Sequence, residues 1–303
     1  MLSLESKEKN YWISVSDDDL LLLDKVVQFL RNEYPYQLGG ELWTQEYFEW
    51  KLGEKNPGGK GFMSVALFNG IVIGVVTLTR KRILLNGVKY DGGEVGDSYS
   101  SIKARRNFFP YELSKHDSNP KSYLNKSIFG RLASDVRVRA ENHGVSTIYG
   151  VPNKNAYPGW VNRLDYFEAK ECNNMSFSRP GNYYLVNKFI KLKNILFIFN
   201  IINRIIIGIT SFLYNFKYKN INFICDKPEN YEIDKLWEKV KPQKGFSLIR
   251  DEAYWKYRYL TRPKVEYTLF SYYLDRELIG LVSVRMIEDN KFMKTICLSL
   301  IHI

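Results

Sequence analysis

The strongest constraint on the fold of this chain is an internal repeat. The aromatic and basic run Tyr47–Lys51 is echoed by the run Tyr254–Arg258. A proline, a glycine and an arginine follow at matching positions in both copies, about 206 residues apart: Pro57 and Pro263, Gly74 and Gly280, Arg80 and Arg285. A repeat of this length, with helix, proline and strands in the same order, predicts a duplicated domain rather than an array of short units.

The composition is that of a packed protein. Of 303 residues, 45% are hydrophobic and 15% aromatic, which is enough for two ordinary domains and excludes a disordered tail or a collagen. The cysteines Cys172, Cys225 and Cys297 form no CxxC pair and have no metal-ligand spacing. We therefore expect a reducing cytoplasm, no disulfide scaffold and no metal. The charged N-terminus lacks a long apolar core, so no secretory signal is expected.

The formal net charge of +11 has two explanations. It favours an anionic partner, or it reflects the Lys-, Asn- and Ile-rich usage of an AT-rich coding bias. Because no zinc finger, arginine-rich helix or RNP-type strand is present, nucleic acid is not favoured as the partner.

The first part of the chain predicts a helix and then hairpins. Apolar residues spaced three to four apart after an acidic start predict a helix over 17–34. Asn69-Gly70 and Asn86-Gly87 each lie between strand-like runs and predict tight turns, because both residue types tolerate positive φ.

The next part predicts alternating strands and helices. A strand with a polar face is expected at 94–101, followed by a long loop at 102–125. A helix over 128–142 is expected to end at Gly144, and a buried strand at 146–151 leads into a short helical turn.

The most apolar window, residues 195–216, is long enough to cross a bilayer but carries Arg204 near its middle. Three interpretations stay open: a packed interdomain helix, an interfacial helix on anionic lipid, and a true membrane span. We expect a packed or surface helix, in a cytoplasmic protein for which peripheral contact with the inner face of the membrane stays open.

These features set the expected domain boundaries. A complete N-terminal domain is expected at 1–187, an apolar and basic linker helix at 188–220, and the start of a second, truncated domain at 221–303. The last residues, 298–303, read LSLIHI, which resembles the translation of a transposon end used to fragment DNA for sequencing. We expect these residues not to be natural sequence.

Short motifs occur in a fixed order along the chain: Gly96-Asp97-Ser98, Lys126-Ser127-Ile128-Phe129, Tyr149-Gly150-Val151-Pro152-Asn153, Arg163-Leu164-Asp165-Tyr166, Leu236-Trp237, Arg250-Asp251 and Tyr257-Arg258-Tyr259. Over most of the chain, this order resembles the GNAT family of acyl-CoA-dependent N-acetyltransferases. More narrowly, it resembles tandem GNAT proteins of bacterial surface-polysaccharide gene clusters. The resemblance implies an α/β (α+β) fold with a GNAT-like mixed, splayed β-sheet flanked by helices, followed by a second, truncated GNAT-like domain.

The resemblance also implies acetyl-CoA, or a related acyl-CoA, as co-substrate and no metal. The pantetheine arm would insert between strands 94–101 and 146–151 and pair like an added strand. The pyrophosphate would bind at the start of helix 128–142, where unsatisfied N–H groups and the helix dipole favour an anion. The residues expected to bind the cofactor are Lys126, Ser127, Ile128, Phe129, Gly130 and, from the turn after the next strand, Asn153.

Two departures from the family pattern affect the expected chemistry. Ser127 stands where the family carries the central glycine of its Arg/Gln-x-x-Gly-x-Gly/Ala motif, which would weaken or reshape pyrophosphate binding. Val161 stands where a tyrosine often protonates the leaving thiolate, so that acid is missing unless Tyr157 replaces it.

Acetylation of an amine needs a base for the ammonium proton, a donor for the thioester oxyanion and an acid for the thiolate. Glu94 and Asp97 are the base candidates, and either fits a structural hydrogen-bonding role equally well. Tyr157 is the acid candidate, with ordinary packing beside Pro158 as the alternative. We expect direct attack by the amine, because no nucleophile paired with a base is recognised in the sequence.

The sequence thus predicts an N-acetyltransferase acting on a small-molecule amine, and the resemblance alone points to an amino sugar of a surface polysaccharide. Two other functions stay open. One is a Fem-like aminoacyltransferase that takes its acyl group from charged tRNA, and the other is a degenerate, non-catalytic GNAT-fold binding protein. The sequence indicates no oligomeric state.

Overall fold

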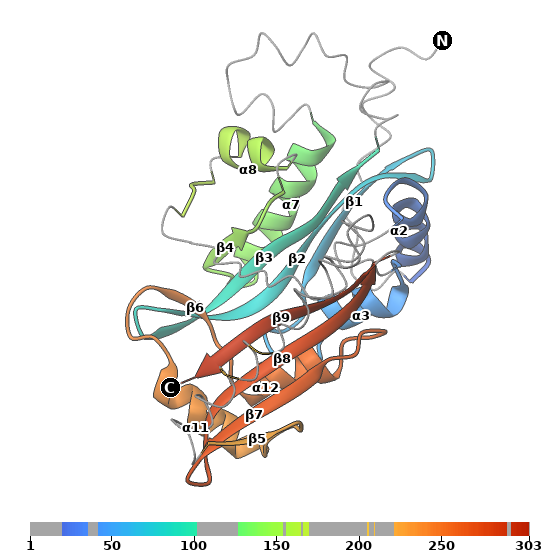
Figure 1. Ribbon diagram of the computed structural model, residues 1–303. Helices are drawn as coiled ribbons and strands as arrows, with labels where there is room; N and C mark the ends of the chain where they lie inside the picture. Colours follow the sequence, from blue (N-terminus) through green and yellow to red (C-terminus); the bar gives the residue numbers. More distant parts are fainter. Residues whose placement is uncertain are drawn as a thin grey trace, which may run out of the picture. The chain divides into compact units, whose positions relative to one another are not determined.

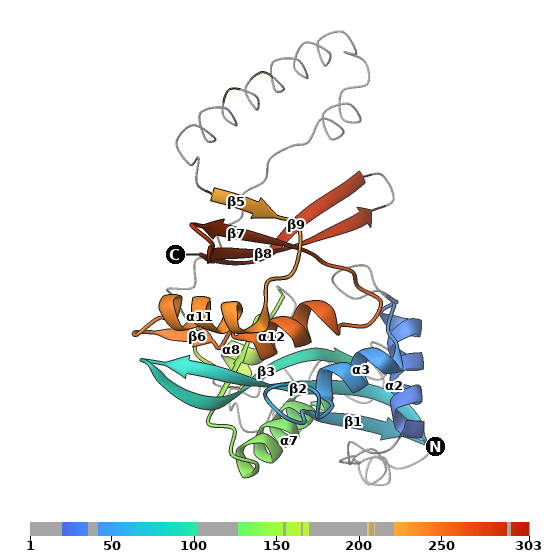
Figure 2. The ribbon, with the colours of Figure 1, turned by 90° about the horizontal axis from the view of Figure 1, so that it is seen from below.

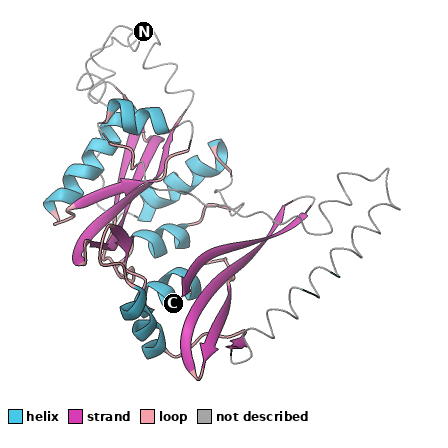
Figure 3. Cartoon of the chain, turned by 60° about the vertical axis from the view of Figure 1, so that its left-hand side comes forward, coloured by secondary structure: helices cyan, strands magenta, loops and turns pink. Residues whose placement is uncertain are grey.

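Figure 1 shows the computed structural model of the chain, which describes residues 20–35, 42–101, 127–153, 156–164, 166–169, 205, 209, 221–289 and 292–302. The chain divides into two compact units. Unit 1 comprises Met1–Glu168 and Lys241–Glu266, and unit 2 comprises Ala169–Val240 and Tyr267–Ile303. Each unit is built around a β-sheet of its own (Figure 3).

Unit 1 combines one mixed sheet with helices on both faces. Its elements in chain order are α2 (Leu20–Glu33), α3 (Gln45–Leu52), β1 (Phe62–Phe68), β2 (Ile71–Leu85), β3 (Val88–Ser100), α7 (Ile128–Asn142), β4 (Thr147–Gly150), α8 (Tyr157–Arg163), β6 (Phe246–Leu248), α12 (Glu252–Trp255) and the π-helical turn η2 (Lys256–Leu260). The strands lie in the order β1-β2-β3-β4, with β6 added to β2. All pairs are antiparallel except β3 with β4, which is parallel. The predicted fold class, a mixed α/β sheet flanked by helices, is confirmed.

The two faces of this sheet bury separate cores, because side chains alternate along a strand. On one face Leu78 and Val95 pack against α7. On the other face Val65 and Val75 pack against α2 and α3. Figure 2 shows α7 and α3 on opposite sides of the sheet. Thr77 alternates with Val76 and Leu78, so it belongs to the α3 face, where the polar residues described below gather.

The two predicted turns are confirmed. Asn69 and Gly70 join β1 to β2 with φ of 50° and 76°, and Asn86 and Gly87 join β2 to β3 with φ of 50° and 79°. The strands are longer than expected, because β2 and β3 pair without a break in the chain from the turn at Asn86 to Ser100. The predicted second hairpin and the predicted strand at 94–101 are therefore parts of one long strand pair.

The predicted helices of unit 1 are present. The first runs over Leu20–Glu33, within the predicted 17–34, and α7 covers the predicted 128–142. The chain turns away after α7 through Gly144, whose φ is 82°. The strand predicted as buried at 146–151 is shorter and only half-buried, and among the described strands β4 pairs with β3 alone.

The segment 241–266 packs within unit 1. Its strand β6 pairs with β2 through Leu248 opposite Ile83. Its Asp251 accepts two hydrogen bonds from the Arg82 guanidinium, at 2.7 and 2.6 Å. The boundaries expected from the sequence (1–187, 188–220 and 221–303) placed this segment in the second domain, so the structure groups it differently.

Unit 2 contains one antiparallel sheet and a helix. Its elements are β5 (Ile221–Ile224), α11 (Asn230–Val240), β7 (Thr268–Leu274), β8 (Glu277–Asp289) and β9 (Phe292–His302), with the strands in the order β5-β7-β8-β9. Helix α11 buries Ile233, Leu236 and Trp237. The residues 298–302, expected not to be natural sequence, form the end of β9.

Two predicted features lie outside the described residues. These are the loop at 102–125 and the linker at 188–220, the latter apart from Ile205 and Ile209, both of which are helical. Within the described ranges, no helix is both long enough and apolar enough to cross a membrane.

Candidate active site

Strands β3 and β4 pair over a short stretch, and β3 then continues beyond the end of β4. The parallel pairs run from Gly92 opposite Thr147 to Val95 opposite Gly150. Strand β3 continues beside β2 to Ser100, but no described strand pairs with its other side beyond Val95. The edge of β3 is thus open here among the described strands, as the predicted splayed sheet requires, and an open strand edge is able to receive an extended ligand.

A bulge at Asp97 reshapes β3 beside this opening. Asp97 has a φ of 43°, and the register between β2 and β3 shifts between Val75 and Thr77. The Asp97 carboxylate accepts a hydrogen bond from the Lys51 ammonium of α3 and lies 3.2 Å from the Thr77 hydroxyl. The side chains of Lys51 and Asp97 are only 15% and 12% exposed, so the ion pair is largely withdrawn from water.

This ion pair changes what Asp97 is able to do. Burial alone would lower the pKa of the Lys51 ammonium, but the Asp97 carboxylate and further negative groups outweigh burial and raise the pKa. Lys51 therefore stays charged and holds Asp97. The arrangement fits a residue that fixes α3 to the bulge better than one that accepts a substrate proton.

Glu94 is the more accessible of the two base candidates. Its carboxylate lies 2.9 Å from the Lys81 ammonium, and its side chain is 38% exposed. Burial raises the pKa of Glu94. The positive charge of Lys81, which has the largest lowering effect, and those of Lys51 and Arg258 together outweigh burial, so the pKa of Glu94 lies below its ordinary value. Glu94 is thus an ionised carboxylate that water or a substrate ammonium can reach.

Tyr149 of β4 stands opposite Glu94 in the parallel register. Its ring packs edge-on against Phe246 of β6, with centroids 5.3 Å apart. Its hydroxyl is buried and has no hydrogen-bond partner among the residues that the structure describes. Burial first and the Glu94 charge second raise the pKa of Tyr149, so the phenol keeps its proton.

One of the main-chain N–H groups at the start of α7 already has a hydrogen-bond acceptor within the chain. The Ser127 hydroxyl accepts a hydrogen bond from the Gly130 N–H at 2.9 Å and so caps the helix. Ile128 is buried in the core, and the Phe129 ring packs against Trp160 at 5.0 Å. Among the residues expected to bind pyrophosphate, Ile128 and Phe129 thus offer only main-chain groups, and Lys126 lies outside the described residues.

Asn153 and Tyr157 are both engaged around α8. The Asn153 side chain accepts from the Ala156 N–H at 2.9 Å, and its carbonyl accepts from the Tyr157 N–H at 2.9 Å. The Tyr157 hydroxyl donates to Glu168 at 3.0 Å, and this hydrogen bond raises the pKa of Tyr157. No contact within the described part of the chain joins Tyr157 to Glu94 or Asp97.

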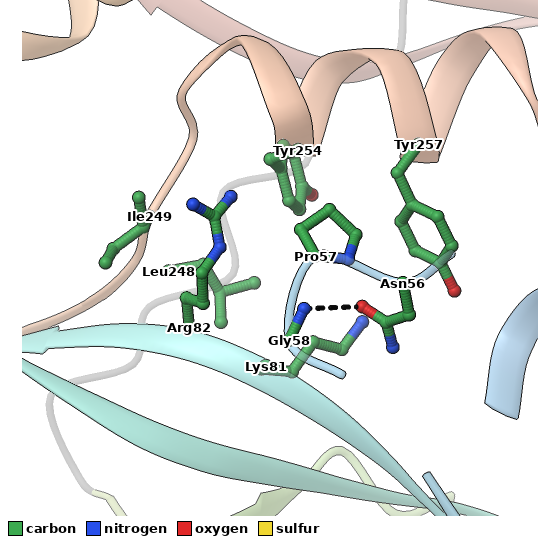
Figure 4. A pocket seen from close by; sticks show the side chains of 9 residues that line it. All are labelled: Asn56, Pro57, Gly58, Lys81, Arg82, Leu248, Ile249, Tyr254 and Tyr257. Carbon is green, nitrogen blue, oxygen red and sulfur yellow. Dashed lines mark hydrogen bonds between the residues drawn. The ribbon is translucent and has the colours of Figure 1, made fainter. Parts of the chain in front are cut away.

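A small pocket is lined in part by Lys81, the ion-pair partner of Glu94 (Figure 4). It is lined by Asn56, Pro57, Gly58, Lys81, Arg82, Leu248, Ile249, Tyr254 and Tyr257. Its volume of about 20 Å³ gives room for one or two water molecules. Because Lys81 lines this pocket and pairs with Glu94, the pocket is suited to hold solvent beside the site.

Sequence reasoning missed Lys51, Lys81 and Tyr149 as parts of this site. A signal for one of them was present, because Thr77, Thr79 and Lys81 occupy alternate positions and so lie on one face of a largely buried strand. Metal binding gains no support, since no group of His, Cys, Asp and Glu among the described residues could hold an ion.

No protein-family model matches the chain, and no curated protein sequence matches it. Among solved structures, it is similar to Saccharomyces cerevisiae N-myristoyltransferase with bound myristoyl-CoA, at 11% identity and a TM-score of 0.49, covering 96% of this chain and 65% of that chain. It is also similar to a probable N-acyltransferase of unknown function from Enterococcus faecalis, at 12% identity and a TM-score of 0.47, covering 91% and 54%. A third is an aminoglycoside acetyltransferase from an uncultured soil metagenomic sample, at 11% identity and a TM-score of 0.36, covering 55% and 93%.

The chain thus spans less than two thirds of the first two of these structures. At such identities and scores the likenesses assign no activity to this chain. The function proposed next therefore rests on the chain's own residues.

Proposed function

We propose that the chain is an acyl-CoA-dependent N-acyltransferase. The observation that carries the proposal is the edge of β3 beyond Val95, with which no described strand pairs, together with the ionised Glu94 beside it. The pantetheine arm of an acyl-CoA is an extended chain with amide groups, so it is able to pair with an open strand edge. A carboxylate next to the thioester supplies the base that amine acylation needs.

In the proposed reaction the ammonium group of the acceptor binds Glu94, which removes its proton directly or through one water. The neutral amine attacks the thioester carbonyl, so that a C–N bond forms and the C–S bond breaks. The products are the amide and CoA, whose thiolate takes a proton from an acid or from solvent. Tyr157 remains the proposed acid, although it now donates to Glu168.

The finer assignments rest on the motifs rather than on the geometry. We propose acetyl-CoA as donor, a small-molecule amine as acceptor, an amino sugar of a surface polysaccharide as the particular case, and a cytoplasmic location. The duplication is supported by the hairpins of the two units. The β1–β2 register shifts after Ala66 and the β7–β8 register shifts after Tyr272, and both turns take positive φ.

A non-catalytic ligand-binding protein is the second candidate. It is favoured by one observation, which is that the Ser127 hydroxyl already occupies the Gly130 N–H. A pyrophosphate placed at the start of α7 would have to displace this hydrogen bond or do without it, and either would weaken acyl-CoA binding.

The test is release of free thiol from acetyl-CoA in the presence of a panel of amines, together with thermal stabilisation by CoA. We expect turnover, and a loss of about 10²- to 10⁴-fold in kcat for Glu94→Gln if Glu94 is the base. Glu54→Gln is the control, because the Glu54 carboxylate is exposed and is not part of the candidate site. Stabilisation by CoA without turnover would favour the binding protein, and the absence of both would overturn the proposal.

A further inference from the structure

In the described part of unit 1, several buried side-chain donors have no hydrogen-bond partner, and two of them come from β4 and from the residues that follow β6. One is the Tyr149 hydroxyl, and the other is Nε of Arg250, which follows β6. A buried donor without an acceptor is unfavourable, because it has lost its water and gained nothing in return. These two donors need an explanation, because one of them stands opposite the base candidate Glu94 in the strand register.

Contacts of β4 and β6 bring the residues that carry these two donors into the same part of unit 1. The Tyr149 ring packs on Phe246 of β6, the strand that leads directly to Arg250. The main chain before Arg250 is held by β2, since the Ile249 N–H donates to the Arg82 carbonyl at 3.0 Å. The Arg250 charge also lowers the pKa of Tyr149, in opposition to burial and to Glu94, so Tyr149 interacts electrostatically with both residues.

The chemistry of the pair selects its ligand. Arg250 is permanently cationic and Tyr149 keeps its proton, so both can only donate at these atoms. An acceptor oxygen with negative charge satisfies both donors, whereas a water molecule satisfies them without balancing the guanidinium. Glu94, opposite Tyr149 on the neighbouring strand, is instead paired with Lys81.

We propose that Tyr149 and Arg250 form a subsite for a carboxylate or phosphate oxygen of the acceptor, whose ammonium group is held by Glu94. The acceptor class is therefore an amine that also carries an anionic group, rather than a neutral amino compound. This inference rests on the proposed function, because it names the acceptor of the same site. The carboxylate and the phosphate share one chemistry, and the experiment separates them.

The experiment is calorimetric titration of the full chain, without acyl-CoA, with two matched pairs of amines. Phosphoethanolamine is compared with ethanolamine, and β-alanine with propylamine. We expect the anionic member of at least one pair to bind about tenfold tighter, as one charge-assisted hydrogen bond provides. The pair that shows the preference identifies phosphate or carboxylate as the group recognised. Equal affinities within both pairs would overturn the subsite.

Two variants and one control assign any preference to these residues. Tyr149→Phe and Arg250→Gln are each expected to reduce it to within about twofold, since each removes a charge-assisted hydrogen bond. Lys55→Gln removes one positive charge, as Arg250→Gln does, but at an exposed position that is not part of the candidate site. This control is expected to keep the preference for the anionic amine. A preference that survives in both Tyr149→Phe and Arg250→Gln overturns the assignment.

Thermal unfolding of the free protein gives an independent readout. Tyr149→Phe removes a hydroxyl that has no partner, so the free variant is expected to melt at or above the wild-type temperature. A clear drop would show that the hydroxyl already has a partner and would overturn the proposal. If the anionic preference is present but no amine is acylated, the subsite stands and the proposed function fails. If amines are acylated but the anionic amines are not preferred, the proposed function stands and the subsite fails.

Discussion

Trp50 and Tyr257 bind each other reciprocally. The Trp50 indole donates to the Tyr257 carbonyl at 3.1 Å, and the Tyr257 hydroxyl donates to the Trp50 carbonyl at 3.0 Å. Their rings stack with centroids 4.7 Å apart and planes 13° from parallel. The two residues are 207 positions apart and occupy matching places in the internal repeat. An exchange of equivalent bonds between matching residues is the pattern of an approximate two-fold axis, which supports the proposed duplication.

A double-mutant cycle tests how strongly this contact stabilises unit 1. We expect Trp50→Ala and Tyr257→Ala to be coupled by about 0.5–1.5 kcal/mol, the range for stacked aromatic pairs. Tyr257→Phe keeps the stack and loses only the hydroxyl, so it is expected to cost about 1 kcal/mol. Urea unfolding measures all of these changes. Additive effects of the two alanine substitutions would show that the rings do not stabilise each other.

Features of the fold that depend on neighbouring residues could be predicted from the sequence. The turn at Asn69-Gly70 and the helix 128–142 follow from local φ preferences and from apolar periodicity, and both are present. The joining of segment 241–266 to unit 1 could not be predicted, because it depends on the long-range pairs Arg82–Asp251 and Trp50–Tyr257. No local pattern encodes such pairs.

The same distinction applies to the candidate site. Glu94 and Asp97 could be proposed because they lie on one predicted strand. Their different settings could not, since Asp97 is held by Lys51 from a helix far away in the sequence and Glu94 by Lys81 from the neighbouring strand. Tyr149 belongs to one of the motifs recognised in the sequence. The burial of its hydroxyl could not be predicted, because it depends on how β4 packs beside β3 and β6.

Removing Lys51 is expected to leave Asp97 as an uncompensated, nearly buried charge. We expect Lys51→Met to destabilise the protein by about 3–5 kcal/mol, the cost of breaking a buried ion pair from one side. Adding Asp97→Asn should recover part of this loss, because it removes the stranded charge and asparagine tolerates positive φ. Chemical denaturation of the single and double variants checks this. A double variant no more stable than Lys51→Met would contradict it.

Asp251 has two roles that different substitutions separate. It accepts from Arg82 and also caps α12 by accepting from the Tyr254 N–H at 3.1 Å. Asp251→Ala loses both roles, and its lost cap alone is expected to cost about 1 kcal/mol. Asp251→Asn retains a side-chain oxygen for the cap and loses the ion pair, so thermal melts should place it between wild type and alanine. If the two variants melt together, the cap contributes nothing.

The lowered pKa of Glu94 makes stability depend on acid pH. Because the folded-state pKa lies below its ordinary value of 4.5, the stabilisation is complete above that pH and is lost as the pH falls through the folded-state pKa. The difference in unfolding free energy between wild type and Glu94→Gln should therefore shrink in the acid range. Urea unfolding over a series of pH values measures it. Lys81→Met should reduce this pH dependence, since Lys81 is the largest single cause that lowers the pKa, and an unchanged profile would argue against the pairing.

Ser127 decides whether the start of α7 is available to a pyrophosphate. Its hydroxyl occupies the Gly130 N–H, so Ser127→Gly releases that donor at a cost of only a few tenths of a kcal/mol, about the usual effect at a helix N-cap. If the pyrophosphate binds there, calorimetry should show acetyl-CoA affinity rising by up to about tenfold, as one hydrogen bond to a charged group allows.

Thr44→Ala is the matched control, because it removes the corresponding cap of α3 on the opposite face. It should lower stability and leave acetyl-CoA affinity unchanged. An affinity that stays constant or falls in Ser127→Gly would place the pyrophosphate away from the Gly130 amide.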